Sequence, residues 1–160
     1  MGKRRLILIA FIVLTLISTA IATAMTEKWT ANLTTPDSTK VIGKAVITSS
    51  INLFITSRSE RAKRNFQGSI IIDTKNLPKL KKNSKGTLTE VYEAWLVDTH
   101  SGYKLSIGLF ETDKNNQGTL AFKTRAYFTE YDKVVITKES FPDPDPSPSS
   151  TIVLSGDIIK

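Results

Sequence analysis

Polar and apolar residues alternate along most of the chain from Val41 onward, in runs rich in Val, Ile, Thr, Tyr and Phe that clusters of Gly, Pro, Asn, Asp and Ser separate. Such runs are typical of strands, and such clusters are typical of turns. Residues 57–65 carry too few apolar residues for a helix with a buried stripe, so we expect a solvated loop there. The pattern predicts strands at residues 41–50, 51–57, 68–74, 89–98, 104–111, 118–124, 133–139 and 150–156.

Strands that follow one another without helices point to an antiparallel sandwich or barrel. Because this many strands favours two packed sheets, we predict an all-β fold, an antiparallel β-sandwich of about seven or eight strands over residues 41–160. The strand at 89–98 is apolar on both faces, with Trp95 on one face and Tyr92 on the other, which predicts a central strand. We expect Trp95 to fill the space between the sheets, and the alternative is an anchor for a partner.

The first 24 residues have the parts of an export signal: a basic cluster, an uncharged apolar run from Leu6, and small residues ending at Ala24. Two interpretations stay open. Cleavage before Met25 would release the rest of the chain, whereas an uncleaved segment of 19 uncharged residues, 6–24, is long enough to anchor it in a membrane. In both cases we expect residues 25–160 outside the cytoplasm, exported as a secreted or membrane-anchored protein.

Two stretches interrupt the strand pattern. Residues 25–40 are polar and rich in Thr, and we expect an extended arm or linker that could add to the sheet edge of a neighbour. The sequon at Asn32 offers a possible glycosylation site. Residues 141–150 carry alternating prolines, which remove ladder donors, so this segment predicts a stiff, extended connector.

The composition is that of an ordinary globular protein, with 40% hydrophobic and 23% charged residues. The net charge of +7 falls to +4 once residues 1–24 are set aside, since they hold 3 of the 22 basic residues and none of the 15 acidic ones. With no Cys and one His, the chain cannot form disulfides, thiolate metal sites or a multi-histidine metal centre.

Few groups are placed for catalysis or metal binding, and we expect no enzyme activity, no cofactor and no metal. His100, beside Asp98 and Ser101, crowds one predicted hairpin tip, whereas a catalytic base, orienter and nucleophile converge from separate elements. Oxygen ligands for Ca²⁺ occur in two loops without the spacing of an EF-hand: Asp113, Asn115, Asp143 and Asp145.

Basic residues gather in two loops that flank the strand at 68–74. They could contact anionic lipid headgroups or cell-wall polymers, and plain solvation is the alternative. We expect no nucleic-acid binding, because exposed aromatic residues do not interleave with the basic ones. The possible basic surface comprises Arg58, Arg61, Lys63, Arg64, Lys79, Lys81 and Lys82.

A series of motifs over residues 66–157 resembles the C-terminal, extracytoplasmic domain of anti-sigma-K factors. The series contains a Leu-Pro pair, a Tyr-x-x-Trp-Leu strand, a Gly-x-Phe strand and a strand ending in Glu before a proline-containing loop. The resemblance implies the fold, the outside location and a sensing or protein-contact role. Its residues here are Leu77, Pro78, Tyr92, Trp95, Leu96, Gly108, Phe110, Val135, Thr137 and Glu139.

The chain also departs from that family. Its members join the outer domain to a membrane span and a cytoplasmic sigma-binding domain, but here only five residues precede the apolar segment. We therefore do not expect this chain to bind a sigma factor by itself. The family's glycine pair in the last loop is replaced by residues 143–146, of sequence Asp-Pro-Asp-Pro.

The function that we expect is that of a non-enzymatic module contacting an envelope protein or a surface polymer outside the cytoplasm. A structural subunit of a surface layer or filament, using residues 25–40 as an arm, is the alternative, and self-association would then be expected. A secreted hydrolase working through carboxylates is a third and weaker hypothesis, because no carboxylate pair stands out.

Overall fold

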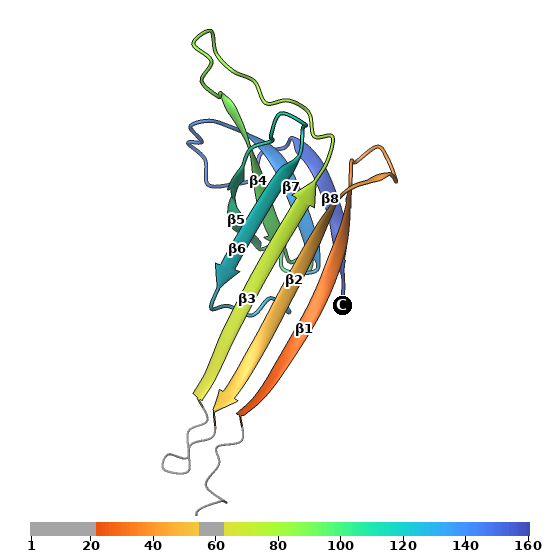
Figure 1. Ribbon diagram of the computed structural model, residues 1–160, viewed down its shortest axis with the longest axis vertical. Helices are drawn as coiled ribbons and strands as arrows, with labels where there is room; N and C mark the ends of the chain where they lie inside the picture. The colour runs from red at the N-terminus through yellow and green to blue at the C-terminus, as the bar shows by residue number, and fades with distance from the viewer. Residues whose placement is uncertain (1–21, 55–62) are drawn as a thin grey trace, which may run out of the picture.

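A computed structural model describes residues 22–54 and 63–160, which fold into eight strands (Figure 1). None of the described residues belongs to a helix long and apolar enough to span a membrane. The strands are β1 (Ala22–Thr34), β2 (Val41–Phe54), β3 (Lys63–Thr74), β4 (Glu90–Val97), β5 (Lys104–Phe110), β6 (Gly118–Thr124), β7 (Lys133–Ser140) and β8 (Ile152–Ile159).

All eight strands belong to one continuous antiparallel sheet in the order β5-β4-β7-β8-β1-β2-β3-β6. The sheet curls until its edge strands, β5 and β6, contact each other, so it is barrel-like and nearly closed. The predicted all-β, antiparallel fold of about eight strands is confirmed, but the division into two sheets is wrong. Alternation shows which side chains face inward; it does not show whether hydrogen bonding is interrupted between sheets.

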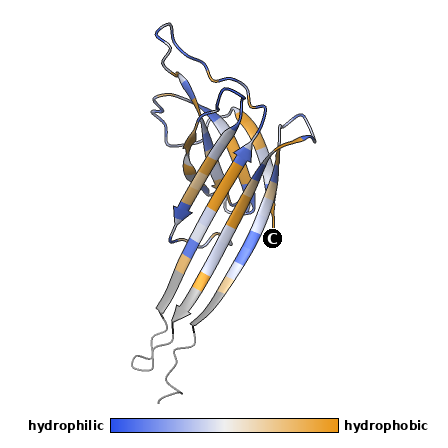
Figure 2. Cartoon of the chain, in the orientation of Figure 1, coloured by the Kyte–Doolittle hydropathy of each residue, from blue (hydrophilic) through white to orange (hydrophobic). Residues whose placement is uncertain are grey.

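The sheet encloses one apolar core, and Figure 2 shows hydrophobic and hydrophilic bands alternating along β2 and β3. Leu77, from the loop between β3 and β4, is buried at one end of the core, and Phe128, from the loop between β6 and β7, is buried near the other. The core side chains that the strands contribute include Trp29, Leu33, Ile47, Ile70, Ile72, Tyr92, Leu96, Phe110, Val134, Ile136 and Leu154.

The N-terminal part of the sheet corrects two expectations. Residues 25–40 do not form a free arm, because residues up to Thr34 lie in β1, which pairs with β2 along its whole length and with β8 from Thr30. Trp29, which lay outside the predicted strands, is only 6% exposed and belongs to the core. The predicted strands 41–50 and 51–57 are one strand, β2. Of the predicted signal, only residues 22–24 are described, as the start of β1.

The proline-rich segment does more than connect β7 to β8. Residues 141–151 fold back over the outer face of β4 and β7, where the Ser149 N–H donates to the Glu139 carboxylate at 2.9 Å. Pro148 and Ser149 line a small hollow together with Trp95. The segment therefore covers part of the sheet in addition to connecting β7 to β8. This cover explains why β4 is buried on both faces, although the sheet has its core on only one.

The first three strands reach beyond the enclosed body of the sheet (Figure 1). β8 pairs with β1 only from Thr30, and β6 pairs with β3 only from Gly68. Residues 22–29, 48–54 and 63–67 thus form a three-stranded part, called the extension below, in which β1 and β3 have no further partner strand within residues 22–54 and 63–160.

Candidate functional site

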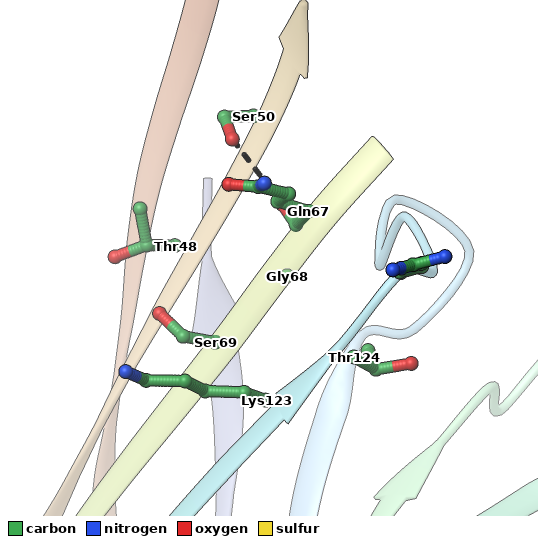
Figure 3. Close-up of a pocket in the computed structure, with 8 residues that line it drawn as sticks. Thr48, Ser50, Gln67, Gly68, Ser69, Lys123 and Thr124 are labelled. Atoms are coloured by element: carbon green, nitrogen blue, oxygen red, sulfur yellow. Dashed lines mark hydrogen bonds between the residues drawn. The ribbon is translucent and has the colours of Figure 1, made fainter. Parts of the chain in front are cut away.

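A polar hollow of about 530 Å³ lies on the outside of β2, β3 and β6 (Figure 3). No segment of the described chain covers it as the proline-rich segment covers β4 and β7. The residues that line the hollow are Thr48, Ser50, Gln67, Gly68, Ser69, Lys123, Thr124 and Arg125.

Strand alternation puts most of these side chains on the outer face. In β2, Ile47 points into the core and its neighbour Thr48 therefore points out. The register aligns Thr48 with Ser69 and Ser69 with Lys123, so that one hydroxyl row leads from β2 to a cation on β6. On the other side, Thr48 is aligned with Lys28 of β1. At roughly 4.8 Å per strand, the Cα atoms of Lys28 and Lys123 lie about 14 Å apart.

The lining supplies hydroxyl and amide groups and two cations, and no lining residue is acidic. The Ser50 hydroxyl donates to the Gln67 backbone carbonyl at 3.5 Å, a long contact that a ligand could replace. The carboxylate of Asp73, further along the same face, accepts a hydrogen bond from the Thr119 hydroxyl at 3.0 Å. Such a surface suits a ligand that carries both hydroxyl and anionic groups, because Lys and Arg form charge-assisted hydrogen bonds with anions.

The residues of the family resemblance divide between the two faces of the other half of the sheet. On the inner side, the Tyr92 hydroxyl donates to the Pro78 carbonyl, and the Tyr92 and Phe110 rings pack at 5.6 Å. Burial raises the pKa of Tyr92 to about 12. Leu77 and Leu96 belong to the same core. Gly108 lies in β5 next to the extra residue of a bulge and has a φ of 134°, a conformation that favours glycine.

The outer members of the same set form a polar cluster under the proline-rich segment. Trp95 is 3% exposed, as packing predicts, but it lies outside the core, with its Nε1 donating to the Thr137 hydroxyl at 2.9 Å. Thr137 in turn donates to Glu139. Val135, half-buried on the same face of β7, lines the hollow beside Trp95. Glu139 also accepts from the Ser149 N–H, which links this cluster to the cover.

Glu93 belongs to this covered cluster and accepts a hydrogen bond from the Ser106 hydroxyl. Burial raises the pKa of Glu93, and the nearby carboxylates of Glu139 and Asp143 raise it further, against the opposing effect of Ser106. Glu93 is 7% exposed, so these neighbours surround a carboxyl group that is largely shielded from solvent.

The predicted basic surface is not one patch. Lys79 and Lys82 line a second hollow of about 420 Å³ with Lys114, but Glu111 and Asp113 line it too. Lys81 forms an ion pair with Glu90 at 3.3 Å. Lys63 and Arg64 begin β3, some ten residues of strand away from that loop, and Arg58 and Arg61 lie outside the described residues.

The loop carboxylates are used within their own turns. The Asp98 carboxylate accepts from the backbone N–H groups of His100 and Ser101, which fixes the predicted hairpin tip. Asp113 likewise accepts from Asn115, and Asp143 accepts from Asp145. Across residues 22–54 and 63–160, no group of three or more His, Cys, Asp or Glu side chains is placed to hold a metal ion.

Asn32 lies in β1 with its side chain exposed on the outer face, next to Lys44 in the register. Glycosylation of Asn32 stays a prediction, since exposure makes attachment sterically possible without indicating that it occurs.

Sequence reasoning missed the hollow itself. Its lining residues are ordinary Ser, Thr and Gln with scattered cations, and nothing in their local pattern distinguishes a ligand site from a solvated face. The usable signal was the polar alternation in β2 and β3 at 48, 50, 67 and 69, but only the strand register places those positions side by side.

Comparisons with known proteins found no relative: no family model matches the chain, and no curated protein or solved structure matches it.

Proposed function

We propose that this chain is a non-enzymatic β module that works outside the cytoplasm and binds an envelope component through the open outer face of β2, β3 and β6. Among the partners expected from the sequence, an envelope protein or a surface polymer, the chemistry of the hollow favours an anionic polymer rich in hydroxyl groups. The observation that carries the proposal is the row Thr48, Ser69 and Lys123 with Arg125 nearby, open to solvent and free of carboxylates.

The shape of the hollow supports this proposal. It extends across three strands and opens to solvent, which suits a chain-like ligand lying across the sheet more than a small molecule enclosed in a pocket. The hydroxyl rows offer repeated hydrogen bonds of modest strength, and the cations add attraction for anionic groups. The resemblance to the outer domain of anti-sigma-K factors, still a prediction, is consistent with a contact role outside the cell.

The test is the affinity of the full chain for polygalacturonate and for polyglycerol phosphate, measured by titration calorimetry at low and moderate salt. Lys123→Ala with Arg125→Ala should weaken binding about tenfold or more, since 1.4 kcal/mol corresponds to a factor of ten. Thr48→Val, which keeps the β-branched shape and removes the hydroxyl, should weaken it less.

The matched control is Lys85→Ala, which removes an exposed cation from the loop between β3 and β4, away from the hollow. Binding that falls equally in the control would indicate general charge attraction in place of a site. Absence of binding to both polymers would contradict the proposal.

A structural subunit is the second function that an observation favours. In the extension, residues 22–29 of β1 pair with no other described strand on the side away from β2, and an open edge can pair with a second copy. Light scattering coupled to size-exclusion chromatography over a hundredfold concentration range would reveal such assembly. Met25→Lys should then suppress it, because a lysine on an edge strand opposes pairing.

A further inference from the structure

The inner face of β1, β2 and β3 carries three successive rows of side chains, each fixed by the strand register. The first row belongs to the core and contains Trp29, Ile47 and Ile70. The second row, one step along the strands, is polar or small and contains Glu27, Ser49 and Gly68. The third row is apolar again and contains Met25, Ile51 and Phe66.

The second row is where the body of the protein is closed. The loop between β6 and β7 crosses it, and the Tyr127 hydroxyl donates to the Glu27 carboxylate at 2.5 Å. The Phe128 N–H points to the Ser49 hydroxyl at 3.5 Å. Gly68 allows Phe128 to approach closely, since a Cβ added at Gly68 would lie only 2.4 Å from the Phe128 ring. The core therefore ends at this crossing loop.

The third row lies beyond this closure and is not part of the core. Met25 is 62% exposed, and Ile51 and Phe66 are half-buried. Tyr127 covers one side of Phe66, with ring centroids 6.0 Å apart. The polar second row separates the third row from the core. Packing of the described core therefore does not explain why the third row is apolar.

The position of the third row identifies its occupant. β1 begins at Ala22, so the chain before it, whose residues 6–21 carry no charge, joins the sheet at this end of the extension. The register places Ala22 opposite Phe54, and Phe54 opposite Lys63, the first of two basic residues that begin β3. The apolar third row thus lies near the end of the extension, close to an uncharged segment and to two basic residues. Apolar and basic residues side by side are typical of a surface that lies on anionic lipid.

We propose that Met25, Ile51 and Phe66 form a lipid-contact surface, on which the inner face of the extension lies against an anionic membrane when residues 1–24 are retained. The open outer face of the same strands, with the polar hollow, then remains in water. This inference concerns a different face from the polymer site, so either can fail without the other.

The chain has no Cys, so single cysteines can be placed and labelled cleanly. The full chain, with its mass verified, is reconstituted in vesicles of phosphatidylcholine and phosphatidylglycerol, and a bimane label is introduced at Ile51 or Phe66. The matched controls carry the label at Ser50 or Gln67, which lie next to the test positions in sequence but on the outer face. Quenching of each label by brominated lipid is then measured.

We expect brominated lipid to quench the labels at Ile51 and Phe66 at least twofold more than those at Ser50 and Gln67, and replacing the phosphatidylglycerol by neutral lipid should reduce the difference. Equal quenching on both faces would overturn the proposal, since the extension would then only be near the membrane. Self-quenching that disappears on dilution with unlabelled protein would assign the row to a second copy and would also overturn it. If the label at Phe66 prevents folding, shown by circular dichroism, the Ile51 and Ser50 pair decides the result.

Discussion

The outside of this sheet differs sharply between its two halves. Over β4 and β7, the proline-rich segment 141–151 covers the sheet and buries Trp95, Glu93 and Glu139. Over β2, β3 and β6, the corresponding face is open and bears Thr48, Ser69 and Lys123. The strands of both halves have one face on the core, and the proline-rich segment covers the other face in only one half.

This comparison teaches how to interpret polar residues on a sheet. The covered half contains two buried carboxylates that are held by hydrogen bonds: Glu139 accepts from Ser149 of the cover, and Glu93 accepts from Ser106 of β5. The hollow in the open half is lined by common hydroxyl, amide and cationic groups, and these face solvent. Accessibility, more than the reactivity of a residue type, decides where this protein can meet a partner.

The largest expected difference between the halves concerns stability. Trp95→Ala should lower the free energy of unfolding by about 3–5 kcal/mol, because it empties a buried site beneath the cover and leaves the Thr137 hydroxyl without its indole donor. Ile71→Ala, on the open face where Ile71 is 47% exposed, should cost less than about 1 kcal/mol. Urea denaturation followed by circular dichroism measures both. Similar losses of unfolding free energy in the two variants would contradict the expected difference in stability between the covered and the open half.

The attachment of the cover should depend on Glu139. Glu139→Ala leaves the Ser149 N–H without its acceptor and should cost about 1–3 kcal/mol. Because the segment then lifts from Trp95, the emission of Trp95 should shift to longer wavelength, measured in a Trp29→Phe background that leaves one tryptophan. Asp73→Ala, which removes an exposed hydrogen bond to Thr119, is the control and should leave both quantities nearly unchanged. An unshifted spectrum in Glu139→Ala would show that the prolines alone hold the cover.

The covered half should also show its own pH dependence. The folded-state pKa of Glu93 is raised, chiefly by burial, so the folded protein holds this proton more tightly than the unfolded chain does. The contribution of Glu93 to stability is therefore full below its unfolded pKa of about 4.3 and is lost as pH rises through the folded pKa. Glu93→Gln should raise the melting temperature at pH 7.5, and the gain should vanish below about pH 4. A gain that persists at low pH would rule out the ionisation of Glu93 as its cause; Glu111→Gln is the exposed control.

The smallest effect is expected on the open face. Ser69→Ala removes a hydroxyl that lies beside Thr48 and Lys123, and the free energy of unfolding should change by no more than about 0.5 kcal/mol. The same substitution should weaken polymer binding measurably if the hollow is the binding site. A large loss of stability would indicate that Ser69 has a structural role and that the two halves are less different than their exposure suggests.

The sequence predicted the strands well wherever alternation was strong. The limits of β6 match the predicted 118–124, and the limits of β4, β5 and β7 differ from their predictions by one residue at one or both ends. Tyr92 and Trp95 lie on opposite faces of β4 as expected, because side-chain direction follows from sequence spacing.

Predictions failed where the outcome depended on partners distant in sequence. β1 was missed because its inward positions, Trp29, Ala31 and Leu33, lie in a stretch dominated by Thr and other polar residues. The position of the cover and the site at Thr48 and Ser69 both depend on which strands are neighbours, and strand periodicity carries no information about pairing order. The basic residues of the two loops that flank β3 lie apart, as strand geometry implies, because most of β3 separates Lys63 from Lys82.

The strand order has a consequence for how the molecule is made. β8 follows all the other described strands in the sequence, yet it lies between β7 and β1 and so joins β5-β4-β7 to β1-β2-β3-β6 through hydrogen bonds. While a ribosome still holds β8, these two parts have no ladder between β7 and β1, and the long-range pairing slows closure further. The two parts should therefore be joined into one sheet only after β8 has left the ribosome.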